Sequence, residues 1–458
     1  MTFLRALPMP PEPLPSARPG GFGAAVAAAN QRARRSLLRN HGGGHAPVSY
    51  LELFFDLVYV FAITQLSLFL HHHLDPLGFI QGMVLFLALW WAWMFTTWAS
   101  NWANPDRLPV RLMMLTLMLL SLLMAVAVPK GFTASAALFA ASYVTLQLGR
   151  TLSMAAMFAG ENPGNARNMV RIAIWFAVSA VFWAIGVLRS DEERLAWWLL
   201  ALGIEYLGPM AMFAVPGLGR STAVNWDISG SHMAERCALF IIIALGEGIV
   251  VIGSTFLGLD KTSGTVGAFA VAFASSAVMW WLYFDLGAVR GARHIQDHSE
   301  PGLVARNAFT YLHMPIVAGI VIYAVADALL LEQWSKPVSL TFILVQAGGA
   351  MLYLTGLGCF KRSGSRHSNF PLSHGVGQML FALLGVWGWF AAPQALSFAS
   401  LGLAIFLLVA IWEWVSYHGG WTERMEARGW PLAARVRRRT EARNAARAAK
   451  REATPASQ

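Results

Sequence analysis

Long apolar segments constrain the fold of this chain more than any other feature of its sequence. Most are about 20 residues long, which lets an α-helix rising 1.5 Å per residue cross a bilayer. Short polar connections containing Pro, Gly, Asn or charges separate them. Twelve such segments can be distinguished, at approximately 50–72, 78–100, 110–129, 133–157, 168–189, 194–215, 233–256, 264–288, 307–330, 338–360, 372–391 and 396–418. We therefore predict an all-α integral membrane protein with about twelve transmembrane helices.

The composition supports a membrane protein and excludes a large soluble one. Of the 458 residues, 56% are hydrophobic and only 13% are charged, against about 25% charged residues in soluble domains. A membrane β-barrel would show apolar residues alternating with polar ones over about 10 residues. Apolar runs such as Met118–Met124 and Ile241–Ile243 do not alternate, which excludes the barrel.

Basic residues are distributed unequally between the two sides that twelve helices would define. One side holds six Arg before residue 48, ten Lys or Arg after residue 418, and thirteen more at loops and helix ends. The other holds five. The thirteen are Arg107, Arg111, Arg150, Arg167, Arg171, Arg220, Arg236, Arg290, Arg293, Arg306, Lys361, Arg362 and Arg366, and the five are Lys130, Arg189, Arg194, Lys261 and Lys336. Because the cytoplasmic side is the positive one, we predict a multi-pass protein of the inner (plasma) membrane with both termini cytoplasmic.

The same pattern divides the chain into segments. We expect a disordered cytoplasmic N-tail at 1–48, a first six-helix repeat at 49–215, a cytoplasmic linker at 216–232, a second six-helix repeat at 233–418 and a basic cytoplasmic C-tail at 419–458. The tails account for the net charge of +10, and their expected partners are the anionic headgroups of membrane lipids. No nucleic-acid recognition fold accompanies them, so no nucleic-acid partner is expected. The oligomeric state, including a homo-oligomer, stays open.

An internal repeat is indicated by polar and aromatic landmarks that recur in the same order. Each half opens with an acid at a helix start and has a polar residue twelve positions later. The next helix carries a Trp pair, the third opens with Arg, and the sixth carries Glu. The corresponding residues are Glu52 and Glu235, Thr64 and Glu247, Trp90-Trp91 and Trp280-Trp281, Arg111 and Arg306, and Glu205 and Glu413. Six helices are an even number, so the two repeats would be parallel, related by an axis along the membrane normal.

Four separated motifs resemble the bacterial low temperature requirement protein A family. They are Leu51–Gln65, Gly217–Ser221, the run from His232 to Glu247, and Tyr311–Gly319. The resemblance covers about residues 47–418 and implies a membrane protein, with a name that records a growth phenotype and no settled biochemical activity. Gly248 stands where the family usually has Ser after the glutamate, and Ala328 replaces a glutamate. The segment Phe54–Thr64 is also similar, more weakly, to the signature opening each six-helix repeat of the lysosomal potassium-channel family, with Phe55 in place of its Ser.

Ionisable residues within apolar helices are the candidate functional residues, because each costs about 2.5–3.5 kcal/mol near the bilayer centre and normally faces the bundle interior. Glu52, Asp56 and Thr64 are spaced by four and eight and share one helix face. Glu247 lies about 16 Å beyond Arg236 along its helix. The proposed transport path consists of Glu52, Asp56, Thr64, Gln65, His232, Glu235, Arg236, Glu247, Asp285 and His313.

Simpler roles compete with these assignments. The acids near the charged rim could form interhelical ion pairs with arginines, whereas no basic residue is expected at the depth of Glu247. His71–His73 is interpreted as a solvated helix terminus and not as a metal site. The 19 tryptophans are explained by packing and interfacial belts, and an aromatic cofactor pocket has no specific support. No cofactor is identified.

Three functions remain open on the sequence. The chain has no nucleotide-binding loop, no His-Glu-x-x-His and no nucleophile elbow, so an enzyme is the less favoured class. The leading hypothesis is a transporter or channel for a small ion or solute, with an acid-lined path between the repeats. The alternatives are an intramembrane enzyme acting on a lipid or isoprenoid through His232, Glu235, Glu247 and His313, and a lipid-sensing membrane scaffold that works through its tails.

The transport hypothesis makes a geometric prediction about two acids. Asp56 and Glu247 should face a common space between the first and seventh helices. Two carboxylates in one low-dielectric space cannot both ionise readily, so at least one would exchange a proton near neutral pH. A salt bridge from Arg236 to Glu247 would instead keep that glutamate ionised.

Overall fold

Twelve long helices dominate the computed structural model, which describes residues 36–39, 47–296, 298, 300–363 and 370–417 and the single residues 429, 438 and 442. Every regular element in these residues is helical, which confirms the all-α part of the prediction. The long helices are α2 (Tyr50–His72), α3 (Pro76–Trp102), α4 (Leu108–Ala127), α5 (Ala136–Ala159), α6 (Pro163–Val187), α7 (Asp191–Met210), α8 (Gly230–Leu257), α9 (Ser263–Leu282), α12 (His313–Gln333), α13 (Leu340–Ser363), α14 (Leu372–Ala391) and α15 (Ala395–Tyr417).

Within the described ranges, nine helical segments are long and apolar enough to cross a membrane. The helices α5, α7 and α14 lie outside these nine, so twelve spans remain a prediction. Large apolar side chains on the outer surface support a lipid environment: Leu57 is 61% exposed, Leu344 61% and Phe390 81%. An apolar surface of this extent is not stable in water. The chain is therefore a multi-pass membrane protein.

Capping residues in the short connections explain where the helices begin. Ser49 and Glu52 form a capping box at the start of α2. Asp75 caps α3 by accepting hydrogen bonds from the backbone of Leu77 and Gly78, with Pro76 in the first helical position. The hydrogen bond from Gly78 is the main reason that the pKa of Asp75 is lowered. Each of these side chains satisfies backbone N–H groups that the first helical turn leaves unpaired.

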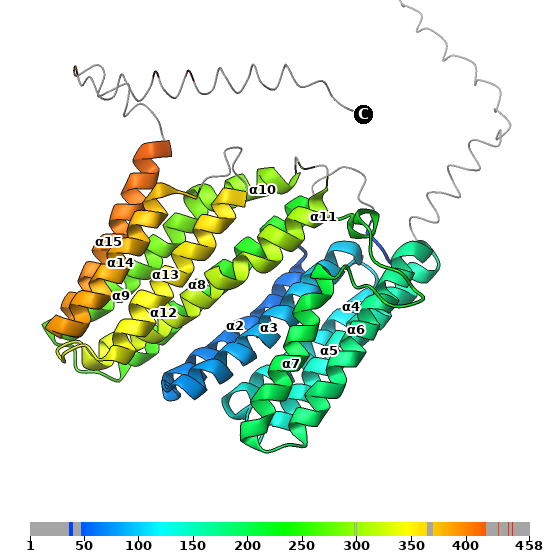
Figure 1. The fold of residues 1–458 in the computed structure, drawn as a ribbon, viewed down its shortest axis with the longest axis horizontal. Coiled ribbons are helices and arrows are strands. Elements are labelled where there is room, and N and C mark those ends of the chain that lie inside the picture. Colours follow the sequence, from blue (N-terminus) through cyan, green and yellow to red (C-terminus); the bar gives the residue numbers. More distant parts are fainter. Residues whose placement is uncertain are drawn as a thin grey trace, which may run out of the picture.

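The helices form two groups, α2–α7 and α8–α15, which we call the first half and the second half (Figure 1). In the first half the contacting pairs include α2–α3, α2–α4, α4–α5, α5–α6, α6–α7 and α3–α7, and α3 also contacts α5. In the second half they include α8–α9, α8–α12, α12–α13, α13–α14, α14–α15 and α9–α15, and further contacts join α9 to α12 and α15 to α12 and α13. Contacts of α8 with α2 and α3, and of α12 with α2, join the halves. The central interface between the halves is thus built mainly on α2 and α8.

Short elements at one end of the bundle depart from the predicted helix boundaries. The π-helical segments η3 (Tyr283–Ala288) and η4 (Ala305–Tyr311) extend α9 and precede α12, and the short helices α10 (Val289–Gln296) and α11 (Pro301–Val304) lie between them. The sequence predicted a helix from 307 and no helix in 289–306. The 3-10 turns η1 (Val128–Lys130) and η2 (Ala223–Trp226) complete the set.

The two predicted tails lie mostly outside the described residues. Ser36–Arg39, inside the predicted N-tail, have a defined position against the end of α3. Leu38 forms an isolated β-bridge with Ala103, and the Arg39 backbone N–H donates to the Trp102 carbonyl at 2.7 Å. This segment closes one side of the candidate site described next. The C-tail at 419–458 is outside the described residues except for three isolated positions.

Candidate functional site

A line of buried polar contacts runs between α2 and α8, and we call it the α2–α8 seam. It consists of Glu52, Asp56 and Thr64 on α2 and His232, Arg236 and Glu247 on α8. The contacts join Glu52 to His232, Asp56 to Arg236 and Thr64 to Glu247. Residue numbers increase together on both helices, so α2 and α8 run parallel. Six of the ten predicted path residues are therefore brought together in pairs.

The first contact of the seam is a network around Glu52, which is 1% exposed. One carboxylate oxygen lies 2.8 Å from His232 Nε2. The other accepts hydrogen bonds from Arg39 Nη2 at 2.9 Å and from the Ser49 backbone at 2.8 Å. Asn101 on α3 lies 3.2 Å from His232 Nδ1. Each oxygen of this buried carboxylate thus has a partner, as a buried charge requires.

The second contact is an ion pair in the protein interior. Arg236 Nη2 lies 2.9 Å from Asp56 Oδ1, and the Trp93 indole donates to the same oxygen at 2.8 Å. The guanidinium carbon is 5.6 Å from the Trp93 ring centroid, within the range of a cation–π contact. In the described part of the chain, Asp56 Oδ2 and Arg236 Nε and Nη1 are buried without a protein partner.

The third contact places Glu247 deepest along the seam. Its Oε2 accepts a hydrogen bond from the Thr64 hydroxyl, and its buried Oε1 has no protein partner among the residues that the structure describes. Arg236 pairs with Asp56, so the salt bridge considered for Glu247 does not form. At Gly248, an added Cβ would lie 3.6 Å from Ala324 Cβ and 3.7 Å from Ser276 Oγ. A serine hydroxyl from α9 therefore stands close to the place of the missing family serine.

Asp56 and Glu247 each have a different partner. Asp56 lies on α2, and the α2 partner of Glu247 is Thr64. These two α2 positions are eight residues apart, or about 12 Å along the helix. That the two acids share one space and titrate together therefore stays a prediction.

The other four predicted path residues lie beside the seam or away from it. Gln65 is half-buried next to Thr64, and Glu235 is half-buried and accepts a 3.4 Å hydrogen bond from the Val48 backbone. Asp285 lies in η3. The ring of His313, at the start of α12, contacts the Tyr283 hydroxyl at 2.8 Å and the Ala308 carbonyl at 2.9 Å. The acid–base groups of the enzyme hypothesis are thus divided between separate contact networks.

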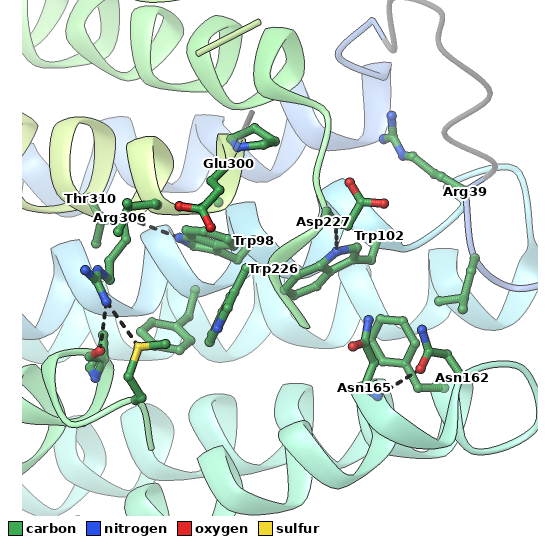
Figure 2. Close-up of a pocket in the computed structure, with 18 of the residues that line it drawn as sticks. Arg39, Trp98, Trp102, Asn162, Asn165, Trp226, Asp227, Glu300, Arg306 and Thr310 are labelled. Atoms are coloured by element: carbon green, nitrogen blue, oxygen red, sulfur yellow. Dashed lines mark hydrogen bonds between the residues drawn. The ribbon is translucent and has the colours of Figure 1, made fainter. Parts of the chain in front are cut away.

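A cavity of about 900 Å³ opens at the end of the bundle where the seam begins (Figure 2). Its lining comes from the end of α3, the α5–α6 connection, the end of α7, η2, α11 and η4. The lining residues are Leu38, Arg39, Phe95, Trp98, Trp102, Phe158, Glu161, Asn162, Asn165, Pro209, Met212, Trp226, Asp227, Glu300, Pro301, Gly302, Leu303, Arg306 and Thr310. We call it the tryptophan pocket. It has the size of small-molecule sites in proteins.

Arg39 connects the tryptophan pocket to the seam, because it lines the pocket and pairs with Glu52. Within the pocket lining, Trp98 donates a 3.2 Å hydrogen bond to the Thr310 hydroxyl. None of the predicted path residues lines this pocket. The available signal was the set Trp98, Trp102 and Trp226 near polar connections, which the sequence analysis assigned to packing and interfacial belts.

Each half also contains a glutamate on its last helix that is held by neighbouring helices, Glu205 being buried and Glu413 half-buried. Glu205 on α7 accepts hydrogen bonds from Tyr143 on α5 and from Ser179 and Trp183 on α6. Glu413 on α15 lies 2.5 Å from Lys361 on α13 and 3.6 Å from His374 on α14. In both halves, the fourth and fifth long helices hold the glutamate of the sixth. The two acids that the sequence analysis paired as landmarks therefore have corresponding neighbours.

Comparison with known proteins places this architecture in a family. The model of the bacterial low temperature requirement A protein matches residues 47–412. An uncharacterized protein of Rhizobium meliloti (strain 1021) is 39% identical over 383 residues, which cover 83% of this chain and 92% of that protein. No solved structure matches. The match includes α2, α8 and every helix and turn that lines the tryptophan pocket, whereas Leu38 and Arg39 precede it, and the chain belongs to the bacterial low temperature requirement A protein family.

Proposed function

We propose that the protein is a transporter or channel for a small ion or solute, entered through the tryptophan pocket and gated at the α2–α8 seam. The observation that carries the proposal is the position of Arg39, which both lines the pocket and pairs with the first acid of the seam. Through Arg39, the pocket thus adjoins a row of buried polar groups between the two halves. A path of ionisable groups inside a helical membrane protein is typical of transport.

The proposal includes two parallel six-helix repeats. Six contacting helix pairs of the first half have counterparts in the second, and α2 and α8 lie parallel across the central interface. The landmark pair Thr64 and Glu247 meets there in one hydrogen bond. In transporters built from repeats, the substrate site lies at the repeat interface. We also propose twelve spans in the inner membrane with both termini cytoplasmic, which would make the tryptophan pocket face the cytoplasm.

The direct pairing of every seam residue corresponds to a closed path. Opening requires the halves to separate or the pairs to exchange partners. Glu247 is the decisive group because no described residue is bonded to its Oε1. A passing proton or cation would use that oxygen.

Flux through the purified protein tests the proposal. In proteoliposomes, we expect movement of protons or of a common inorganic ion, and Glu247→Gln should lower its rate at least about tenfold, equivalent to roughly 1.4 kcal/mol on the barrier. The matched control is Glu332→Gln, since Glu332 is 45% exposed and contacts only His71 among ion-pair partners in the described chain. Absence of flux for protons, cations, anions and small organic solutes would contradict the proposal, as would equal rates in both variants.

A further inference from the structure

We propose that the tryptophan pocket binds a small organic cation, such as an alkylated ammonium compound. This inference rests on the proposed function, for which it names the substrate class. Three features of the pocket carry it: the orientation of its indoles, the charges around them and the size of the cavity.

The indole groups form one wall of the pocket. The ring centroids of Trp98 and Trp226 are 5.1 Å apart, those of Trp98 and Trp102 5.9 Å, and those of Trp102 and Trp226 6.1 Å. The Trp102 N–H donates to the Asp227 carbonyl at 2.6 Å, and the Trp98 N–H donates to Thr310. Trp98 and Trp102 are only 6% and 5% exposed, whereas Trp226 is half-buried. Trp226 therefore provides most of the accessible indole surface of this wall, and an indole is the best aromatic group for a cation.

The backbone of α11 fixes the position of this wall. A Cβ added at Gly302 would lie 2.3 Å from the Trp226 carbonyl oxygen, so α11 packs against Trp226 more closely than any other residue type would permit. The preceding residue pair, Glu300 and Pro301, is thereby held at the pocket rim. In Figure 2 the Glu300 carboxylate is turned toward Trp98.

The charges around the pocket favour a cation. Three carboxylates line it, on Glu161, Asp227 and Glu300. Of its two arginines, Arg39 is paired with Glu52. Arg306 has neutral hydrogen-bond acceptors, the Pro209 carbonyl, the Met212 sulfur and the Asn307 amide oxygen. The three lining carboxylates thus outnumber Arg306, which is the one lining arginine without a carboxylate partner in the lining or the seam.

The size and chemistry of the lining favour an organic cation over a metal ion. The cavity volume of about 900 Å³ far exceeds that of a bare ion. In the part of the chain that the structure describes, no group of three His, Cys, Asp or Glu residues could hold a metal. Hard metal ions need converging oxygen ligands, whereas this wall is aromatic. An alkylated ammonium group instead gains from aromatic faces and from carboxylates at a distance.

Equilibrium binding of choline to the full-length protein in nanodiscs tests this assignment. Choline and its uncharged isostere 3,3-dimethylbutan-1-ol have nearly the same shape, so their difference measures the charge. We expect choline to bind at least about tenfold more tightly, a difference of about 1.4 kcal/mol. Trp226→Leu should weaken choline binding roughly tenfold, and Trp226→Phe should weaken it less because an aromatic face remains.

An exposed carboxylate provides a variant that leaves the packing unchanged. Glu300→Gln should weaken choline binding about threefold to tenfold. Glu192→Gln should not weaken it, because Glu192 is exposed in the first turn of α7, whereas the pocket is lined by the last turn of that helix. Size-exclusion profiles and thermal midpoints of the same samples establish that each variant is folded.

The outcomes separate the two proposals. Equal binding of choline and the alcohol, or binding of neither, would overturn the cation assignment. So would binding of inorganic phosphate that competes with choline and is lost in Arg306→Gln. Choline binding without any flux in proteoliposomes would support the site and contradict transport. Flux of an inorganic ion without choline binding would do the reverse.

Discussion

Asp56 and Arg236 are two buried charged residues that offset the cost of desolvation by pairing with each other. Both are at most 3% exposed, and their mutual contact is supported by the Trp93 indole. Removing one partner of such a pair leaves an uncompensated buried charge, while removing both does not. The seam should therefore respond to single and double neutralisation very differently.

We predict that Asp56→Asn and Arg236→Gln each lower the free energy of unfolding by about 3–5 kcal/mol. The double variant should lose much less than the sum of the two. Unfolding in mixed SDS micelles gives the three values. Asp106→Asn is the control. Asp106 pairs with Arg111 across 3.8 Å, and the two side chains are 87% and 54% exposed, respectively. Such surface pairs contribute about 0–1 kcal/mol. Additive losses in the double variant would show that the two charges act independently.

The sequence predicted the face of these residues and not their partners. Spacings of four and eight placed Glu52, Asp56 and Thr64 on one side of a helix, and all three contact α8. The partners depend on the relative position of two helices separated by about 180 residues, which helical periodicity does not encode. An interhelical pair was weighed for Asp56 and Arg236, but the Thr64–Glu247 contact was not predicted.

Among the elements, α12 and α13 illustrate close helix packing through glycine. A Cβ added at Gly319 would lie 2.5 Å from the Tyr353 backbone nitrogen, whereas one added at Gly348 would meet no atom within 4 Å. Small residues let membrane helices approach closely enough for extensive van der Waals contact. These two glycines therefore differ in role although both belong to the same helix pair.

We predict that Gly319→Ala lowers the free energy of unfolding by about 1–3 kcal/mol, because the extra methyl group forces α12 and α13 apart. Gly348→Ala should leave it unchanged or raise it by up to about 1 kcal/mol through the better helix propensity of alanine. The same SDS unfolding measurement compares them. The packing argument fails if both substitutions have the same effect.

The positions of the long helices were predictable because apolar length and capping residues are local signals. All twelve predicted segments overlap a long helix. The region between α9 and α12 was not predicted, since η3, α10, α11 and η4 are short and are held by contacts with α8 and η2. Local sequence patterns carry little information about elements stabilised in this way.

For the whole molecule, the positions of the arginines refine the orientation argument. Arg150 and Arg236 were counted among loops and helix ends, but both are at most 1% exposed inside helices. Arg150 donates to the Thr96 hydroxyl and to the Ala92 carbonyl at 3.2 and 3.3 Å. They report on internal pairing and not on the side of the membrane. The remaining basic residues, 11 against 5, still favour a cytoplasmic pocket end.

Cysteine accessibility tests this orientation. In a background without Cys237 and Cys359, we expect Glu192→Cys to react with a membrane-impermeant maleimide in intact cells. Asp106→Cys should react only after permeabilisation, because it lies on the same end of the bundle as the tryptophan pocket. Labelling of both variants in intact cells would contradict an odd number of spans between the two positions. Labelling of Asp106→Cys alone in intact cells would show that the protein has the opposite orientation in the membrane.

The tryptophan pocket belongs to the molecule as a whole and could not be read from any one segment. Its lining comes from positions between 38 and 310, brought together only when both halves and the linker between them are folded. The indoles are explained singly by ordinary interfacial placement, and only their mutual distances indicate a site. A single sequence contains no record of those distances.

The π-helical segment η4 determines how α11 is rotated about the helix axis relative to α12. Across it the Leu312 N–H donates to the Asn307 carbonyl, five residues back, at 3.3 Å, so this turn holds one residue more than an α-helical turn. Deleting one residue from 305–311 would restore regular winding and rotate α11 by about 100° around the common axis, since an α-helix has 3.6 residues per turn. Gly302 would then leave Trp226. A relative with that deletion would keep the span and lose the pocket wall.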